Sequence, residues 1–341
     1  MKNKNILLLS TGGTIASVPG KHGLSPETKG QMLVECLPED PKKEHVKVTY
    51  EDILCIDSSN MHAKEWITIA EKILKIQNEY DAVIITHGTD TMAYTASMLS
   101  YLLVGCHIPV ILTGAQKPLG VQGTDALKNI QDAFRVAYAA EYPMVMVVFY
   151  GRIILGNHSC KVNATSYDAF HSVYSEYIGR IEKKKVIWNE ALLEKILQNE
   201  VPVQHMGISN QVILVKLYPG ISGEIFSWIN DKEYRGIVLE SFGCGGIPSM
   251  YGDVLNQIGE LVHDGKVVAV KTQCYYGNTN MDIYEVGKRA LMQGAVCISN
   301  MTTEALVTKL MWALDFCSGE QAVRLLKKDV CGELTHVRRS R

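Results

Sequence analysis

The fold of this chain is decided by residues 6–17, which read ILLLSTGGTIAS. The short apolar run Ile6–Leu9 stops at a turn rich in hydroxyl groups and glycine. A run that is apolar at every position is typical of a strand buried on both faces of a parallel sheet. The two glycines let the backbone turn sharply and approach a ligand closely. Thr14 follows that turn, where an open parallel sheet places its ligand crevice.

The same design occurs twice more along the chain. Residues 82–85, AVII, run into THGTD, and residues 109–112, PVIL, run into TGAQKP. An isolated TGGT is most simply a strand and turn with two incidental threonines. Three apolar strands that end in similar turns instead imply one shared polar rim.

Strands and amphipathic helices alternate along most of the sequence, which predicts an α/β fold built on parallel sheets. Residues 182–211 interrupt the alternation, and a second α/β set follows them. We therefore assign residues 1–190 to an N-terminal domain, 191–211 to a linker and 212–341 to a C-terminal domain. Strands are expected at 46–49, 53–56, 82–86, 109–113, 144–149, 212–218, 236–241 and 267–272, and helices at 64–80, 91–104, 124–139, 222–231, 253–264, 283–293 and 303–314.

Residues 18–31 contain three glycines and two prolines, which predicts a loop beside the first turn. A mobile lid that closes over substrate is the functional interpretation. An ordinary surface loop fits the composition almost as well.

Composition narrows the class of function. A net charge of −2 gives no support for a nucleic-acid partner or an anionic membrane surface. The apolar run near the N-terminus is shorter than a signal peptide needs, and no run approaches the ~20 residues of a membrane helix. We therefore expect a cytoplasmic protein without a membrane partner.

The sequence carries no motif for a metal or a coenzyme. The nine cysteines are widely spaced and form no CxxC pair, and the histidines do not cluster at ligand spacing. Neither GxGxxG nor GxxxxGK[ST] is present. We expect no cofactor and no metal, which leaves the chemistry of a hydroxyl with a base: attack on a carbonyl, with backbone N–H groups stabilising the oxyanion.

Thr89 and Asp90 stand where the helix expected at 91–104 begins. Either residue could simply be the helix N-cap, which is a common role. A helix N-terminus also attracts anions such as a substrate carboxylate. Both roles can hold at once.

The two longest motifs, TGGTIAS at 11–17 and THGTDTM at 86–92, resemble the signature motifs of the bacterial-type L-asparaginase family. The absence of a signal peptide and the Asp-Ser-Ser form resemble its cytoplasmic, type I branch. The family's fold pairs a larger flavodoxin/Rossmann-like N-terminal domain with a smaller Rossmann-like C-terminal domain. Further segments match the family in order through residue 305: Asp57-Ser58-Ser59, Thr113-Gly114-Ala115-Gln116, Lys161, Ser241-Phe242-Gly243 and 301–305.

The resemblance implies hydrolysis of L-asparagine to L-aspartate and ammonia through an acyl-threonine intermediate, without a cofactor. It makes Thr14 the nucleophile and Thr89, Asp90 and Lys161 a second set of hydroxyl, acid and base. Lys161 could accept a proton from Thr89 if its neighbours favour the neutral amine; alternatively it is only the ion-pair partner of Asp90.

The resemblance also assigns residues to the substrate. Asp57, Ser58 and Ser59 would hold its amino-acid end, Asp90 would pair with its ammonium group, and backbone around Ala115 would contribute to the oxyanion hole. The implied substrate-binding set is Asp57, Ser58, Ser59, Thr89, Asp90 and Ala115. Because the family builds its sites between paired subunits, a homodimer or homotetramer is expected.

One departure from the family concerns the lid, where members often carry a tyrosine that assists the first threonine. Leu24 aligns with that tyrosine, and no tyrosine lies between residues 17 and 31. The group that deprotonates Thr14 is therefore open: Lys161 through Thr89, a water, or Tyr275 or Tyr276 of a facing subunit.

Two other hypotheses remain. The amidohydrolase subunit of a tRNA-dependent amidotransferase shares these motifs, but usually carries an extra N-terminal domain, whereas here the first strand begins at Ile6. A non-catalytic amino-acid-binding module also suits two α/β lobes. Preference for asparagine or glutamine depends on one methylene, which a pocket discriminates by ~1–3 kcal/mol.

Overall fold

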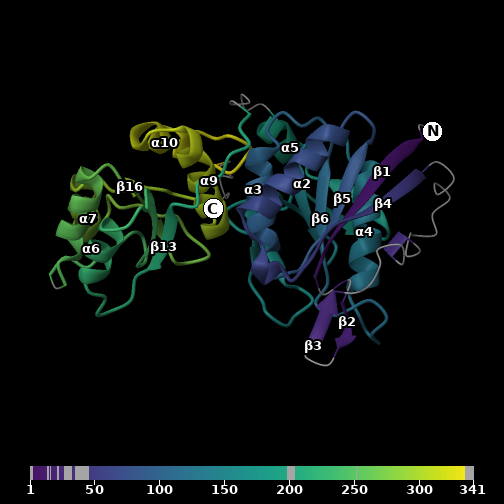
Figure 1. The fold of residues 1–341 in the computed structure, drawn as a ribbon, viewed down its shortest axis with the longest axis horizontal. Helices are drawn as coiled ribbons and strands as arrows, with labels where there is room; N and C mark the ends of the chain where they lie inside the picture. The colour runs from purple at the N-terminus through teal and green to yellow at the C-terminus, as the bar shows by residue number, and fades with distance from the viewer. Residues whose placement is uncertain are drawn as a thin grey trace. The chain divides into compact units, whose positions relative to one another are not determined.

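The computed structural model describes residues 3–13, 15, 17–20, 23–26, 33–34, 46–197, 204–250 and 252–334. The chain divides into two compact units, Met1–Gln204 and His205–Arg341. Each unit is a mixture of helices and strands built on its own sheet, drawn from purple to teal and from teal to yellow in Figure 1. The predicted α/β class is confirmed, with a large, mainly parallel sheet in the first unit and a smaller parallel sheet in the second.

The sheet of the first unit has the strand order β12-β11-β8-β7-β6-β5-β1-β4. Its parallel part is β4-β1-β5-β6-β7, so the chain runs outward from β1 in both directions and the strand order reverses between β1 and β5. Open α/β sheets bind ligands outside the carboxyl ends of their strands at such a switch point. The parallel strands are β1 (Lys4–Gly12), β4 (Val46–Ile56), β5 (Ala82–Thr86), β6 (Val110–Thr113) and β7 (Val145–Phe149).

Burial explains why these segments form strands. Every residue of β5, β6 and β7 is buried, as the continuous apolar runs of the sequence predict. The sheet lies between α2 and α3 on one side and α4 on the other (Figure 1). These helices are α2 (Ala63–Ile76), α3 (Met92–Leu102) and α4 (Ala126–Ala139), within the ranges predicted from their periodicity.

Beyond β7 the chain forms antiparallel elements that the apolar pattern did not predict. β7 pairs antiparallel with β8, and β8 continues into β11 and β12. The turn between β11 and β12 contains Lys183 and Lys184 at φ 48° and 66°, a left-handed conformation that glycine or asparagine usually supplies. The elements are β8 (Arg152–Leu155), η4 (Gly156–His158), β9 (Ser159–Lys161), β10 (Phe170–Ser172), β11 (Gly179–Glu182), β12 (Lys185–Trp188) and α5 (Glu190–Leu197).

The loop predicted at 18–31 contains a small hairpin. β2 (Ser17–Gly20) pairs antiparallel with β3 (Gly23–Pro26), and the backbone of Leu24 lies opposite Pro19. The remaining residues of that range lie outside the described ones. The two strands predicted at 46–49 and 53–56 are one continuous strand, β4, because Tyr50 to Asp52 continue its pairing with β1.

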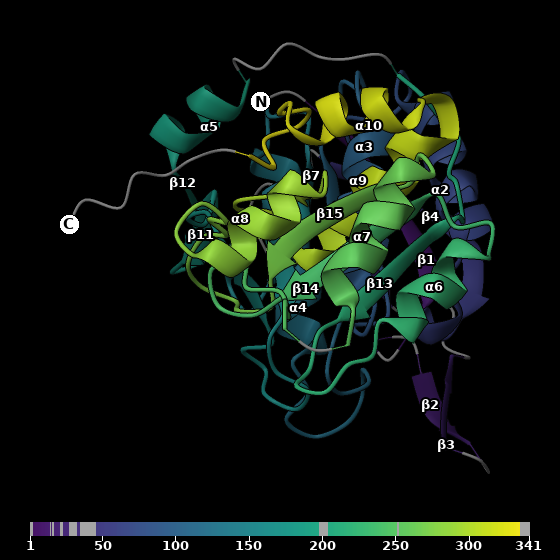
Figure 2. The same ribbon diagram turned by 90° about the vertical axis from the view of Figure 1, so that its left-hand side faces the viewer.

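The second unit is a four-stranded parallel sheet in the order β13-β14-β15-β16. Its core is formed by the strands with α6, α7 and α8, which cover one face in Figure 2, while α9 packs against β13 and β14 and α10 packs against β15. The elements are β13 (Val212–Lys216), α6 (Glu224–Asn230), β14 (Gly236–Ser241), α7 (Val254–His263), β15 (Val267–Thr272), α8 (Glu285–Met292), β16 (Val296–Cys297), α9 (Thr303–Phe316) and α10 (Gly319–Leu326). No described helix is both long enough and apolar enough to span a membrane.

Candidate active site

The three strand ends singled out in the sequence meet at the switch point. A methyl group on Gly13 would lie 2.4 Å from the Cα atom of Gly88, and one on Gly114 would lie 2.4 Å from the carbonyl oxygen of His87. Real Cβ atoms do not approach other atoms so closely, so these backbones pack directly against one another only because the residues are glycine. Gly13 also has φ +76°. The carboxyl ends of β1, β5 and β6 therefore form one rim.

The Asp57–Ser59 turn lies against this rim. A methyl on Gly88 would be 2.6 Å from Ser58 Oγ, and the Thr91 hydroxyl donates to the carbonyl oxygen of Ser58 over 2.7 Å. The Asp57 carboxylate accepts the backbone N–H of Ser59 (2.8 Å), and this bond lowers the pKa of Asp57 below its ordinary value. Three of the predicted substrate-binding residues thus lie beside the turn that carries Thr89.

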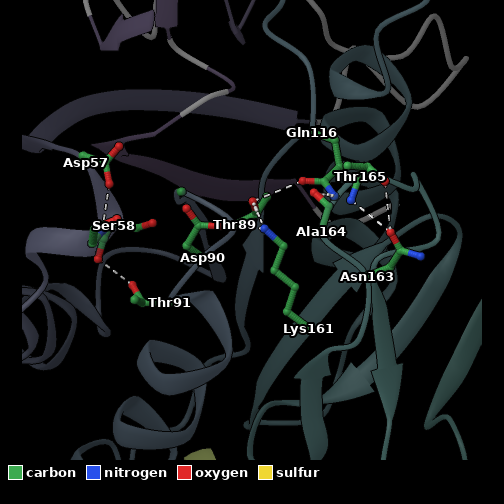
Figure 3. Close-up of polar contacts among 12 residues, drawn as sticks. Asp57, Ser58, Thr89, Asp90, Thr91, Gln116, Lys161, Asn163, Ala164 and Thr165 are labelled. Atoms are coloured by element: carbon green, nitrogen blue, oxygen red, sulfur yellow. Dashed lines mark hydrogen bonds and ion pairs between the residues drawn. The ribbon is translucent and has the colours of Figure 1, made fainter. Parts of the chain in front are cut away.

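Lys161, Thr89 and Asp90 form one polar cluster. Lys161 ends β9, and its Nζ donates to Thr89 Oγ1 over 2.8 Å and to Asp90 Oδ1 over 2.6 Å. The Lys161 side chain is 16% exposed and that of Asp90 is 65% exposed. The ammonium group is therefore mostly withdrawn from solvent, while most of the Asp90 carboxylate stays accessible. Figure 3 shows Lys161 reaching Thr89 from one side and Gln116 meeting it from the other.

Gln116 is a member of the cluster to which the sequence assigned no role. Its Oε1 accepts the Thr89 hydroxyl (3.3 Å), and its Nε2 donates to the carbonyl oxygens of Ala164 (3.2 Å) and Ser166 (3.1 Å). These contacts join the turn after β6 to the loop after β9. The residue stood in the quoted TGAQKP segment, but periodicity could not reveal partners about fifty positions away.

Asp125 holds the turn on which Ala115 and Gln116 stand. Its buried carboxylate accepts the backbone N–H groups of Gln116 (3.0 Å) and Lys117 (3.0 Å) and the side-chain amide of Asn129 (3.1 Å). Ala115 is buried just before these two N–H groups. A carboxylate that accepts several N–H bonds fixes a loop strongly.

A fully buried histidine supports the Thr89 turn from below. His87 Nδ1 lies 2.7 Å from the carbonyl oxygen of Gly88, and its Nε2 lies 2.9 Å from Thr95 Oγ1, which also accepts the Trp66 indole N–H over 2.9 Å. Because a carbonyl only accepts, Nδ1 carries the proton and Nε2 accepts from Thr95. Burial lowers the pKa of His87 to about 4, so the ring is neutral at pH 7.

Thr14 lies outside the described residues, so its side chain has no contacts to report. It directly follows Gly13, whose backbone is packed against Gly88. Tyr275 and Tyr276 belong to the second unit and are 53% and 57% exposed.

The described cluster offers hydroxyl, ammonium and carboxylate groups at the edge of a parallel sheet. A hydroxyl 2.8 Å from an amine is the geometry that proton transfer requires. Among the described residues, no group of three or more histidine, cysteine, aspartate or glutamate side chains could hold a metal ion. The arrangement suits nucleophilic chemistry on a substrate with an amino-acid group.

Comparison with known proteins identifies the class. Residues 5–194 match the family model for the asparaginase N-terminal domain, and residues 211–325 match the model for the glutaminase/asparaginase C-terminal domain. The chain therefore belongs to the asparaginase family.

Individual relatives carry two different names. The chain is 33% identical to an L-asparaginase of Thermococcus kodakarensis, over 97% of this chain and 99% of that protein. It is also 33% identical to one of the proteins that make up the glutamyl-tRNA(Gln) amidotransferase of Pyrococcus abyssi, over 97% of this chain and 76% of that protein.

Solved structures give the same family. The thermostable L-asparaginase from Thermococcus kodakarensis superposes with a TM-score of 0.86 at 32% identity, covering 98% of this chain and 100% of that one. L-asparaginase I from Vibrio cholerae superposes with a TM-score of 0.81 at 28% identity, covering 98% and 99%.

Proposed function

We propose that this protein hydrolyses L-asparagine to L-aspartate and ammonia through an acyl-enzyme on Thr14, without a cofactor. The observation that carries the proposal is the Lys161 ammonium, which donates to both Thr89 Oγ1 and Asp90 Oδ1 at the switch point of the sheet. Family membership and the likeness to two L-asparaginase structures support it.

The proposed reaction has two steps. In the first, Thr14 Oγ attacks the side-chain amide carbon, a C–O bond forms, and the C–N bond breaks as the nitrogen takes a proton and leaves as ammonia. In the second, water attacks the ester, and the C–O bond to Thr14 breaks to release aspartate. Both steps place negative charge on the former carbonyl oxygen, which backbone around Ala115 would stabilise.

Thr89 and Lys161 would move protons during these steps. A neutral Lys161 amine would take the Thr89 hydroxyl proton across their 2.8 Å contact. Asp90, with its exposed carboxylate, would hold the substrate ammonium group, and Asp57, Ser58 and Ser59 would bind its amino-acid end.

The base for Thr14 keeps three candidates because Leu24 stands where many members have tyrosine: Lys161 through Thr89, a water, or Tyr275 or Tyr276 of a second subunit. We propose a homodimer or homotetramer, which the exposure of both tyrosines permits. Size-exclusion chromatography with light scattering tests the assembly, and activity of Tyr275→Phe and Tyr276→Phe tests the last candidate.

The decisive experiment measures ammonia release from L-asparagine and L-glutamine on one preparation without added cofactor. We expect turnover of asparagine, and we expect Thr14→Val to lower kcat by about 10⁴-fold or more while Thr14→Ser keeps measurable activity. Acid quenching during turnover, followed by peptide mass analysis, should find an aspartyl adduct on the peptide that contains Thr14. An adduct on another residue refutes the nucleophile assignment.

The amidotransferase relatives favour a second candidate, the amidohydrolase subunit of a tRNA-dependent amidotransferase. In that case, ammonia release would depend on a partner protein and tRNA. Full asparaginase activity of the isolated protein excludes it. Tight binding of asparagine without turnover would instead indicate a binding module.

A further inference from the structure

We infer that Gln116 is a positioning residue that transmits the conformation of the 163–166 turn to the hydroxyl of Thr89. The inference deepens the proposed function and rests on it, because it concerns the same Thr89–Lys161 pair. It is carried by three hydrogen bonds of one side-chain amide.

The contacts fix the orientation of that amide. Gln116 Nε2 faces two carbonyl oxygens, those of Ala164 (3.2 Å) and Ser166 (3.1 Å), and a carbonyl can only accept. The NH₂ end must therefore point into the turn, and Oε1 must point toward Thr89 (3.3 Å). The reversed amide would place oxygen against two oxygens.

The orientation of the amide fixes the direction of the Thr89 hydroxyl. Oε1 of Gln116 has no hydrogen to donate, so Thr89 donates its hydrogen to Gln116. The lone pairs of Thr89 Oγ1 then face the Lys161 ammonium 2.8 Å away. For a neutral Lys161 to take that proton, the hydrogen must first turn from Gln116 to Nζ. Gln116 thus sets the starting position of the proton transfer.

The turn that orients Gln116 is itself held in place. The Asn163 side-chain oxygen accepts the backbone N–H groups of Thr165 (2.9 Å) and Ser166 (2.8 Å), which closes the turn. Beyond it, the Asp168 carboxylate is bound by both terminal nitrogens of Arg152. The two carbonyl oxygens are therefore presented by a rigid segment (Figure 3).

The test is a double-mutant cycle between Gln116→Met and Asn163→Ala. Methionine keeps the length of the side chain but removes the acceptor and both donors. We expect Gln116→Met to lower kcat for asparagine by about 10- to 100-fold with KM within twofold, because a small displacement of a reacting group costs that much. Asn163→Ala should lower kcat by a smaller factor, and Asn163→Asp, which keeps an acceptor oxygen, should restore it.

The prediction specific to positioning is that the two effects do not add. Asn163→Ala should have no further effect in the Gln116→Met background, because the turn acts on Thr89 only through Gln116. Tyr167→Phe is the matched control: it removes a hydrogen bond between the same two loops, from Tyr167 to the carbonyl oxygen of Gly123, without touching Thr89. Its kcat should be unchanged. Additive losses, or equal losses in Tyr167→Phe, overturn the inference.

A crystal structure of Gln116→Met separates this inference from the proposed function. We expect Thr89 Oγ1 to leave its single position beside Lys161 or to occupy two rotamers. A wild-type protein that releases no ammonia refutes the proposed function, whereas an unchanged Thr89 in Gln116→Met refutes the positioning role whether or not the protein is active.

Discussion

Acidification should destabilise this protein through His87. The ring is fully buried, and its pKa of about 4 in the folded state lies below the ordinary 6.5 expected in the unfolded chain. A lowered histidine pKa means that the unfolded state binds the proton more readily, so the stability that neutral His87 contributes is present above pH 6.5 and is lost as pH falls toward 4. The cause is desolvation of the charged ring, which the hydrogen bond to Gly88 only partly offsets.

The magnitude follows from the two pKa values. One pKa unit corresponds to ~1.4 kcal/mol, so these values imply a loss of about 2 kcal/mol between pH 7 and pH 5 and about 3 kcal/mol by pH 4. The assay is urea unfolding of wild type and His87→Gln at pH 7, 6 and 5. Glutamine does not titrate, and its side chain can still accept from the Thr95 hydroxyl.

His87→Gln should be less stable than wild type at pH 7 by about 1 kcal/mol, because the bond to the Gly88 carbonyl is lost. Its disadvantage should vanish or reverse at pH 5, where wild type carries the cost of the buried histidine. Thr95→Val is the matched control, since it keeps the ring buried and should keep the pH dependence. Parallel stability curves for wild type and His87→Gln from pH 7 to pH 5 would refute the argument.

Two further predictions concern a buried carboxylate and a close backbone contact. Burial, and then the charge of Glu333, raise the pKa of Asp329 to about 6, so the stability that this group contributes is complete below its ordinary pKa of 3.8 and is lost as pH rises through 6. Asp329→Asn should therefore raise the free energy of unfolding by about 1–2 kcal/mol at pH 8 and change it little at pH 4, measured by urea titration; an equal gain at both pH values contradicts the assignment. Gly88→Ala should lower kcat/KM for asparagine by about 10- to 100-fold, because the new methyl would lie 2.6 Å from Ser58 Oγ and displace it. The matched control is Gly246→Ala, whose methyl would meet its nearest atom at 3.5 Å, and equal activity of the two variants contradicts the argument.

The parallel strands could be predicted from the sequence because burial on both faces dictates their composition. β5, β14 and β15 have the predicted bounds, since each is a continuous apolar run closed by a polar residue. β12 could not be predicted in this way, because it is an edge strand with one exposed residue and three half-buried ones. The turn before it places Lys183 and Lys184 at positive φ, where the sequence offers no Asn-Gly signal.

The candidate site divides along the same line. Thr89 and Asp90 were predictable because they follow a buried strand, and Ser58 because its motif precedes a helix. Gln116 was not, because its function depends on two carbonyl oxygens that the sequence cannot place in space. The assignment of Thr14 stays a prediction.

The antiparallel extension after β7 is what brings the cation to the rim. Helix α3 begins just after Asp90, and it packs against η4 and β9, the segment that ends at Lys161. That packing is close: a methyl on Gly156 would lie 2.9 Å from Ser100 Oγ and 3.0 Å from the carbonyl oxygen of Ala96, both on α3. The parallel sheet alone would present Asp90 at a helix start with no ammonium group beside it. The elements that periodicity detects least well are therefore the ones that position Lys161, and substitutions in the contact between η4 and α3 should change proton transfer at the site without touching any residue that binds substrate.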